Sequence, residues 1–337
     1  MIRVFVERSG EAPELARAET VAAAEALGGR AGTPGPEGPT ALVEVELPDP
    51  SGARALAARL GLARRCLVPI GDGEERALEA LEHAATPGRS AAVRRFGHPS
   101  GGGTDAGVEQ AGARLRARGV RIDLEQPDHR LWIVGDEGSV ERLFEEVSAV
   151  DRPAFGRRRM PQLPFQRPVS LAPRLARAAA NLARVRPGDP VLDPFVGTGA
   201  LLAEAGLLGG RLFGIDRDPT MVRGALRNFE HLRVAPEELV VGDAGEVQIG
   251  DAVGAFAAVL TDPPYGRASG TGGEEAGGVV ARVLPRWAER VAPGGRVVVV
   301  LPGGPDPLPP PWRRVVSVPV RVHRSLTREF RVYERAA

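Results

Sequence analysis

Residues 190–208, PVLDPFVGTGALLAEAGLL, decide the fold that this sequence predicts. The apolar run PVLDP leads into a turn that carries Gly197 and Gly199, and the helical pattern ALLAEAGLL follows it. A turn of small residues between a strand and a helix lets a ligand contact the backbone at the carboxyl edge of a parallel sheet. A tight structural turn can look the same, so the neighbouring segments must support the interpretation.

The segments that follow keep the alternation of strand and helix. RLFGID, LVVGD, AFAAVLTD and GRVVVVLP are near-continuous apolar runs, MVRGALRNF has a helical pattern, and two more extended runs lie between Trp312 and Glu334. Apolar strands that alternate with helices predict a parallel sheet covered on both faces. We therefore expect residues 168–337 to form an α/β domain with a mostly parallel seven-stranded sheet of the Rossmann type.

The first 167 residues have a different pattern, which predicts smaller α+β modules. Residues 1–60 hold the alternating segments IRVFVE and ALVEVELP around an Ala-rich helix, and residues 61–150 hold further strands, two helices and a last helix from Ser139. Residues 151–167 show no period and contain three prolines, which is typical of a linker.

The composition bounds the class of protein. The net charge of +1 gives no bulk attraction to a polyanion, so any nucleic-acid surface must come from local arginine clusters. Cys66 is the only cysteine, which excludes an intrachain disulfide and a cysteine-rich metal site. No apolar run is long enough to span a membrane and the start lacks the layout of a signal peptide, so we expect a soluble, cytoplasmic protein with no membrane partner.

Three details indicate which ligand the glycine turn binds. No Gly-Lys-Ser/Thr follows the turn, which excludes a P-loop. Leu202 stands where a dinucleotide-binding site has its third glycine, and the Asp193 carboxylate would repel a pyrophosphate. A carboxylate at that place instead suits the cationic, amine-bearing end of S-adenosylmethionine. Asp216, with Asp218 as its rival, ends the second strand where a ribose diol would lie, and Asp243 after the third strand suits an adenine amino group.

The fourth strand ends in Thr261-Asp-Pro-Pro-Tyr-Gly266, the most informative stretch for chemistry. The two prolines fix the backbone so that the Asp262 carboxylate and the Pro263 carbonyl can point at one spot, with the Tyr265 ring beside it. Two acceptors that hold both N–H groups of an exocyclic amine turn the nitrogen lone pair toward a methyl donor, while the ring stacks on the base. The competing interpretation is a proline-stiffened turn with a core tyrosine.

The order DPFVGTG, GIDRD, GDA and TDPPYG resembles that of the amino-methyltransferases acting on adenine N6 or guanine N2. More narrowly, RPVSLAPRLARAAANLARV, TDPPYGR and HRSLTREFRVYE are similar to stretches of the archaeal-type tRNA guanine-10 N2-methyltransferases, and residues 113–136 resemble the latter half of a THUMP RNA-binding domain. This resemblance implies a ferredoxin-like module at 1–60, a THUMP domain at 61–150 and a class I methyltransferase domain at 168–337.

The resemblance also implies roles for individual residues, with S-adenosylmethionine as cofactor, tRNA as partner and no metal. The expected catalytic residues are Asp262, Pro263, Pro264 and Tyr265. The expected cofactor contacts are Ser170, Pro173, Asp193, Phe195, Gly197, Thr198, Gly199, Asp216, Asp218, Asp243 and Ala244. The expected RNA contacts are Arg114, Arg116, Arg118, Arg157, Arg158, Arg159 and Arg267.

Two other functions remain open at this point. An adenine-N6 methyltransferase acting on DNA or RNA would use the same Asp-Pro-Pro-Tyr chemistry, and the THUMP-like stretch argues against it. A non-catalytic RNA-binding protein with a methyltransferase fold is disfavoured because Gly197, Gly199, Asp262 and Tyr265 are intact. Addition of one or of two methyl groups is consistent with the sequence, and we expect a monomer.

Overall fold

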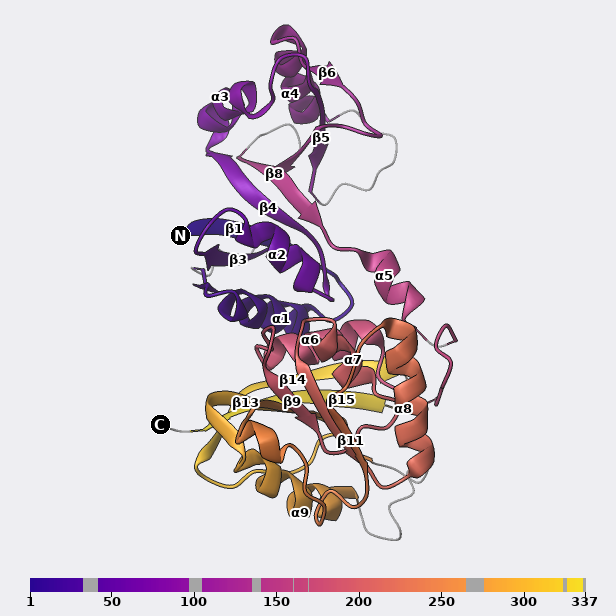
Figure 1. Ribbon diagram of the computed structural model, residues 1–337. Helices are drawn as coiled ribbons and strands as arrows, with labels where there is room; N and C mark the ends of the chain where they lie inside the picture. The colour runs from indigo at the N-terminus through magenta and orange to yellow at the C-terminus, as the bar shows by residue number, and fades with distance from the viewer. Residues whose placement is uncertain are drawn as a thin grey trace. The chain divides into compact units, whose positions relative to one another are not determined.

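A computed structural model describes residues 1–32, 42–96, 105–134, 141–159, 161–168, 170–264, 276–323 and 326–335. By contacts the chain divides into two compact units (Figure 1). The first contains Met1–Gly10, Leu27–Ala58 and Ala63–Val150; the second contains Glu11–Ala26, Arg59–Leu62 and Asp151–Ala337.

The first unit is built on an eight-stranded sheet with the strand order β2-β3-β1-β4-β8-β7-β5-β6. Its strands are β1 (Ile2–Arg8), β2 (Arg30–Ala31), β3 (Leu42–Leu47), β4 (Ala63–Asp72), β5 (Ser90–Arg95), β6 (Arg121–Ile122), β7 (His129–Val134) and β8 (Arg142–Ala149). Its helices are α2 (Gly52–Arg59), α3 (Glu74–Ala84) and α4 (Ala106–Ala117). Strand β4 pairs antiparallel with β1 on one side and with β8 on the other, so residues 1–60 and 61–150 share one continuous sheet.

The helix expected from Ser139 is wrong over the described residues, because Arg142–Ala149 form strand β8. β8 lies between β4 and β7 and pairs antiparallel with both, with Trp132 opposite Phe144. Phe144 is fully buried and packs edge to face on Phe5. Two neighbouring strands that offer backbone partners, and an aromatic cluster that fixes the register, override the local helical preference of this segment.

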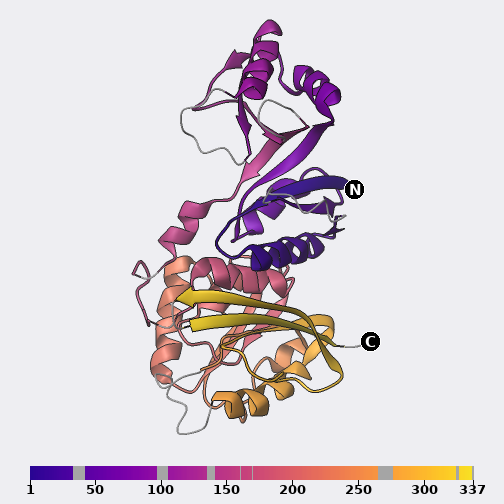
Figure 2. The same ribbon diagram turned by 180° about the vertical axis from the view of Figure 1, so that it is seen from behind.

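The second unit is built on a seven-stranded sheet with the order β11-β10-β9-β12-β13-β15-β14. Its strands are β9 (Pro190–Asp193), β10 (Arg211–Asp216), β11 (Glu238–Val241), β12 (Phe256–Thr261), β13 (Val291–Leu301), β14 (Trp312–His323) and β15 (Leu326–Arg335). Strands β9 to β13 pair in parallel, and β15 is antiparallel to both β13 and β14 at the edge that is yellow in Figure 2. The expected Rossmann-like α/β class is therefore confirmed.

Helices cover both faces of this sheet. One apolar cluster joins it to α6 (Pro173–Leu182), α7 (Ala200–Gly206) and α8 (Pro219–Leu232), and a second joins it to α9 (Ala276–Ala288). A 3-10 turn at Asp251–Val253 precedes β12. Both clusters are rich in Val, Leu and Ala because parallel strands are buried on both faces. The segment expected as a linker carries a short helix, α5 (Arg152–Arg157), which Asp151 caps and whose Phe155 is buried.

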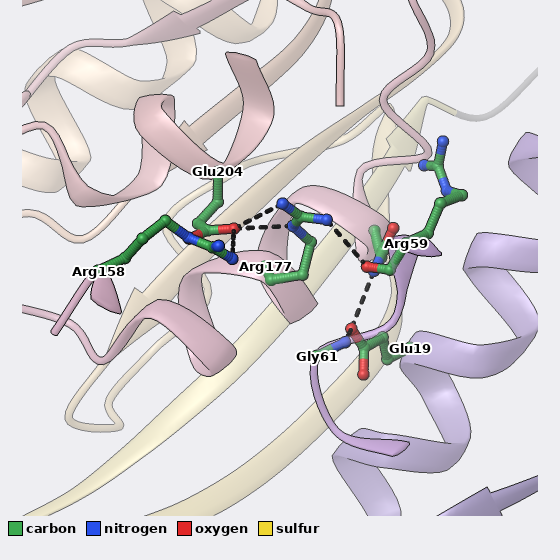
Figure 3. Close-up of polar contacts among 7 residues, drawn as sticks. Glu19, Arg59, Gly61, Arg158, Arg177 and Glu204 are labelled. Carbon is green, nitrogen blue, oxygen red and sulfur yellow. Dashed lines mark hydrogen bonds and ion pairs between the residues drawn. The ribbon is translucent and has the colours of Figure 1, made fainter. Parts of the chain in front are cut away.

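Two segments from the first 62 residues belong to the second unit. Helix α1 (Pro13–Ala26) presents Leu15, Ala16 and Ala22 to the cluster that contains α6, and Leu62 joins the same cluster. Glu19 is fully buried there and accepts hydrogen bonds from the backbone N–H groups of Gly61 and Leu62 and from the Asn181 side chain, as Figure 3 shows in part. The small side chains of α1 allow this close packing against α6, so the second unit begins before the boundary that the composition suggested.

Candidate active site

The glycine turn after β9 opens helix α7. Gly199 is the N-cap residue with φ +82°, and a Cβ there would lie 2.7 Å from the Phe229 ring, so both backbone conformation and space require glycine. Gly197 also has a positive φ, of +52°, and its N–H donates to Asp216 Oδ2 over 2.8 Å. The turn is thus held against the carboxyl end of the neighbouring strand β10, where an open α/β sheet binds its ligand.

Asp193, the last residue of β9, is a buried carboxylate. Among the described residues its oxygen Oδ1 accepts hydrogen bonds from two neutral groups, the Phe195 N–H over 3.0 Å and the Thr261 hydroxyl over 2.8 Å. Burial is the largest cause that raises the pKa of Asp193 to about 7; the negative charges of Asp262 and Asp216 act in the same direction, and the two hydrogen bonds act against it. A cation bound beside Asp193 would favour its ionised form.

The three other carboxylates expected at the cofactor have different surroundings. Burial raises the pKa of Asp216, which accepts from the Asp218 N–H as well as from Gly197. Asp218 caps α8 by accepting from the Thr220 N–H, and this hydrogen bond lowers its pKa. Asp243 accepts from Arg282 of α9, which lowers the pKa of Asp243, and from the Gly245 N–H.

The remaining expected cofactor residues surround the turn. The hydroxyls of Ser170 and Thr198 are 2.8 Å apart, and both residues line a cavity together with Pro173, the first residue of α6. Phe195 packs against the apolar cluster under α9. Ala244 is buried in that cluster, and its carbonyl accepts from the Trp287 indole over 2.8 Å.

Asp262 and Pro263 follow β12 directly, next to the strand that ends in Asp193. Asp262 Oδ2 accepts a hydrogen bond of 2.7 Å from Arg328 Nη1 of β15, whose guanidinium is almost fully buried. Thr261 joins Asp262 to Asp193, because its hydroxyl donates to Asp193. The structure therefore brings the two expected carboxylates, one for the cofactor and one for the substrate, to neighbouring strand ends.

Pro264 is half-buried, whereas Tyr265 and Arg267 lie outside the described residues. Of the arginines expected at RNA, Arg116 and Arg118 are exposed at the end of α4, where Arg114 is half-buried. Arg157 and Arg159 are exposed. Arg158 differs, since its guanidinium contacts the buried Glu204 of α7.

The residues at this edge suit S-adenosylmethionine by their chemistry. Asp193 is buried and its hydrogen-bond donors are neutral, so a cationic ligand would compensate its negative charge. Asp216 and Asp243 are hydrogen-bond acceptors at the ends of the next two strands. Within the described ranges, no group of three His, Cys, Asp or Glu side chains is placed to bind a metal ion. None of the helices described combines the length and the apolar character needed to cross a bilayer.

The fold and these residues define a Rossmann-like methyltransferase domain, for which S-adenosylmethionine is the methyl donor. Residues 162–308 match the profile of the family described as UPF0020: RMKL-like, methyltransferase domain. The chain belongs to the tRNA (guanine(10)-N2)-dimethyltransferase family.

Several curated relatives bear that name. The protein from Methanothermobacter thermautotrophicus is 35% identical over 64% of this chain and 64% of its own length. The protein from Pyrococcus abyssi is 33% identical over 66% of this chain and 67% of its own length. A protein from Methanothermococcus thermolithotrophicus, named a probable enzyme of this kind, is 31% identical over 48% of this chain and 98% of its own length. The chain thus spans slightly under two thirds of the first relative.

Sequence reasoning missed several residues that build the site. Arg328 lies in the stretch HRSLTREFRVYE that carries the resemblance, and Thr261 directly precedes Asp262, so the sequence held a signal for both. Glu204 and Asn228 had no such signal, because only the packing of α7 and α8 brings them to Arg158 and Phe165.

Proposed function

We propose that this protein transfers methyl groups from S-adenosylmethionine to N2 of guanine 10 in tRNA. The observation that carries the proposal is Asp262, which follows β12 beside the buried Asp193 and is ion-paired with Arg328. A guanine amine that approaches Asp262 donates one N–H to its carboxylate, and the Pro263 carbonyl accepts the second N–H. Both contacts orient the nitrogen lone pair, which is otherwise delocalised into the base.

The chain's own residues prepare this arrangement. The ion pair with Arg328 holds the Asp262 side chain in one orientation, in which a carboxylate oxygen can accept a hydrogen bond from the amine. Asp193, Asp216 and Asp243 would hold the cofactor at the neighbouring strand ends, Gly197 and Gly199 allow it to approach the backbone, and Ser170, Pro173, Phe195, Thr198 and Ala244 complete its surroundings. When bound, the cofactor supplies an electrophilic methyl group on sulfur. Pro264 stiffens the turn, and Tyr265 would stack on the base.

The first unit is proposed to bind tRNA. Residues 1–60 would be a ferredoxin-like module and 61–150 a THUMP domain, as the sequence of 113–136 suggests, although the two share one sheet. Arg116 and Arg118 of this unit are exposed and suited to phosphates, as are Arg157 and Arg159 of the second unit, and we keep Arg114 and Arg267 as further candidates. A tRNA substrate also supports a cytoplasmic location.

The direct test is to incubate the protein with labelled S-adenosylmethionine and unmodified tRNA transcripts and to map the modified nucleoside. We expect N2-methylguanosine or N2,N2-dimethylguanosine at position 10. Methyl groups on adenine N6 would favour the alternative enzyme. Binding of both ligands without transfer would favour a non-catalytic RNA-binding protein.

A further inference from the structure

Glu204 of α7 is a buried carboxylate shared by two arginines. Its side chain is 3% exposed; Oε1 accepts from Arg158 Nε over 2.7 Å and Oε2 from Arg177 Nε over 2.8 Å. Figure 3 shows the two guanidinium groups reaching Glu204 from two sides, one from the end of α5 and one from α6. We name Glu204, Arg158 and Arg177 the Glu204 cluster.

The packing around the cluster fixes the end of α5. The Arg158 guanidinium lies 4.4 Å from the centre of the Phe155 ring, and that of Arg177 lies 5.7 Å from it. Replacing a buried ion pair by apolar residues is often neutral or stabilising, so stability alone gives a weak reason for such a cluster. Its specific effect is to hold α5, α6 and α7 in one arrangement.

The chain from Arg158 to Ala172 is attached to the same unit at two more places. Asn228 of α8 accepts from the Phe165 N–H over 2.9 Å and donates to the carbonyls of both Phe165 and Thr198 over 3.0 Å. The hydroxyls of Ser170 and Thr198 form the third attachment. Ser170 contacts Thr198 directly, and Asn228, which holds Phe165, also donates to the Thr198 carbonyl. Thr198 lies within the glycine turn.

The cavity beside the glycine turn connects the cluster to the cofactor residues. Arg158 and Glu204 line it together with Ser170, Pro173 and Thr198. A change in the position of Arg158 therefore moves one wall of the cavity in which Ser170 and Thr198 form another. None of the RNA or substrate contacts proposed above requires Glu204.

We propose that Glu204 is a positioning residue for the methyl-donor site: it binds Arg158 and thereby helps to fix the described residues between Arg158 and Ala172 against the glycine turn. The proposal rests on the proposed function only in taking S-adenosylmethionine as the ligand. Arg158 then acts inside the protein, as an anchor of the cofactor site, instead of contacting tRNA phosphates.

The substitution Arg158→Met tests this proposal with little risk to folding, because the buried Glu204 remains ion-paired with Arg177. We expect the dissociation constant of S-adenosylhomocysteine, measured by calorimetry, to rise about tenfold, as the loss of a charge-assisted hydrogen bond implies. The turnover number at saturating cofactor and the KM for tRNA should stay within about twofold of wild type, and hydrogen exchange should accelerate in residues 158–172.

Arg184→Met is the matched control. Glu334 is also shared by two arginines, Arg184 and Arg296, and the substitution again leaves one of them. We expect cofactor binding within about twofold of wild type for this control. The proposal is overturned if both variants weaken the binding of S-adenosylhomocysteine equally. It is also overturned if Arg158→Met raises the KM for tRNA and leaves cofactor binding unchanged. Wild-type protein that binds no S-adenosylhomocysteine would instead refute the proposed function.

Discussion

Arg328 of β15 donates from Nη1 to Oδ2 of Asp262 over 2.7 Å, and so connects the antiparallel edge of the sheet to the loop after β12. The Arg328 side chain is 6% exposed and that of Asp262 is 17% exposed. Because the guanidinium is buried, its ion pair with Asp262 is screened little by solvent. The C-terminal strands thus contribute directly to the proposed substrate site.

The first prediction concerns this ion pair. Arg328→Met should lower the turnover number about 10- to 100-fold, the effect of losing a hydrogen bond to a charged group. Arg328→Lys, which keeps the charge, should recover part of the loss. Steady-state kinetics at saturating cofactor measures the effect, and S-adenosylhomocysteine affinity should stay within about twofold. Equal losses in cofactor binding and turnover would contradict a role limited to Asp262.

The second prediction separates the two carboxylates. Asp262→Ala should leave S-adenosylhomocysteine binding nearly unchanged and abolish measurable methyl transfer, because Asp262 is assigned to the amine and Asp193 to the cofactor. Calorimetry and a labelled-methyl assay on the same preparation measure both effects. Loss of cofactor binding to the same degree as transfer would show that Asp262 belongs to the cofactor site.

The third prediction is a pH dependence of cofactor binding. Burial raises the pKa of Asp193 to about 7, so the carboxyl is largely protonated at pH 6 and ionised at pH 8. A cationic ligand binds the ionised form more tightly, so affinity for S-adenosylmethionine should rise from pH 6 to pH 8 and then level off. Asp193→Asn should bind more weakly and lack this rise. A flat profile for wild type would refute the assignment of Asp193.

The fourth prediction concerns α1. Leu15→Ala should destabilise the second unit by about 2–5 kcal/mol, because Leu15 is fully buried in the cluster that contains α6. Leu81→Ala is the matched control, since Leu81 is equally buried in the first unit. S-adenosylhomocysteine should raise the midpoint temperature of the same unfolding transition whose midpoint Leu15→Ala lowers. If Leu15→Ala leaves that transition unchanged, the second unit does not depend on α1.

The local patterns of the sequence predicted much of the second unit. The strands that end in Asp193, Asp216 and Thr261 were foreseen because buried parallel strands give continuous apolar runs, and carboxylates and glycines mark their ends. The packing of distant segments was not foreseen. Strand β8 depends on partners in β4 and β7, and the place of α1 depends on the small side chains of α6.

The same distinction holds within the site. Motifs of adjacent residues predicted the glycine turn and the position of Asp262 after β12. The contact of Arg158 was not foreseen from adjacent residues. A run of three arginines suggested phosphate contacts, but the fold brings the guanidinium of Arg158 to Glu204, 46 residues away in sequence. A charge run alone therefore does not tell which of its members face solvent.

The most direct test of the central claim removes one amine from the substrate. Two tRNA transcripts would carry guanosine or inosine at position 10, since inosine lacks only the exocyclic N2 group. With labelled S-adenosylmethionine, we expect methyl incorporation at position 10 of the guanosine transcript and none at that position of the inosine transcript. Equal incorporation into both transcripts would contradict the central claim.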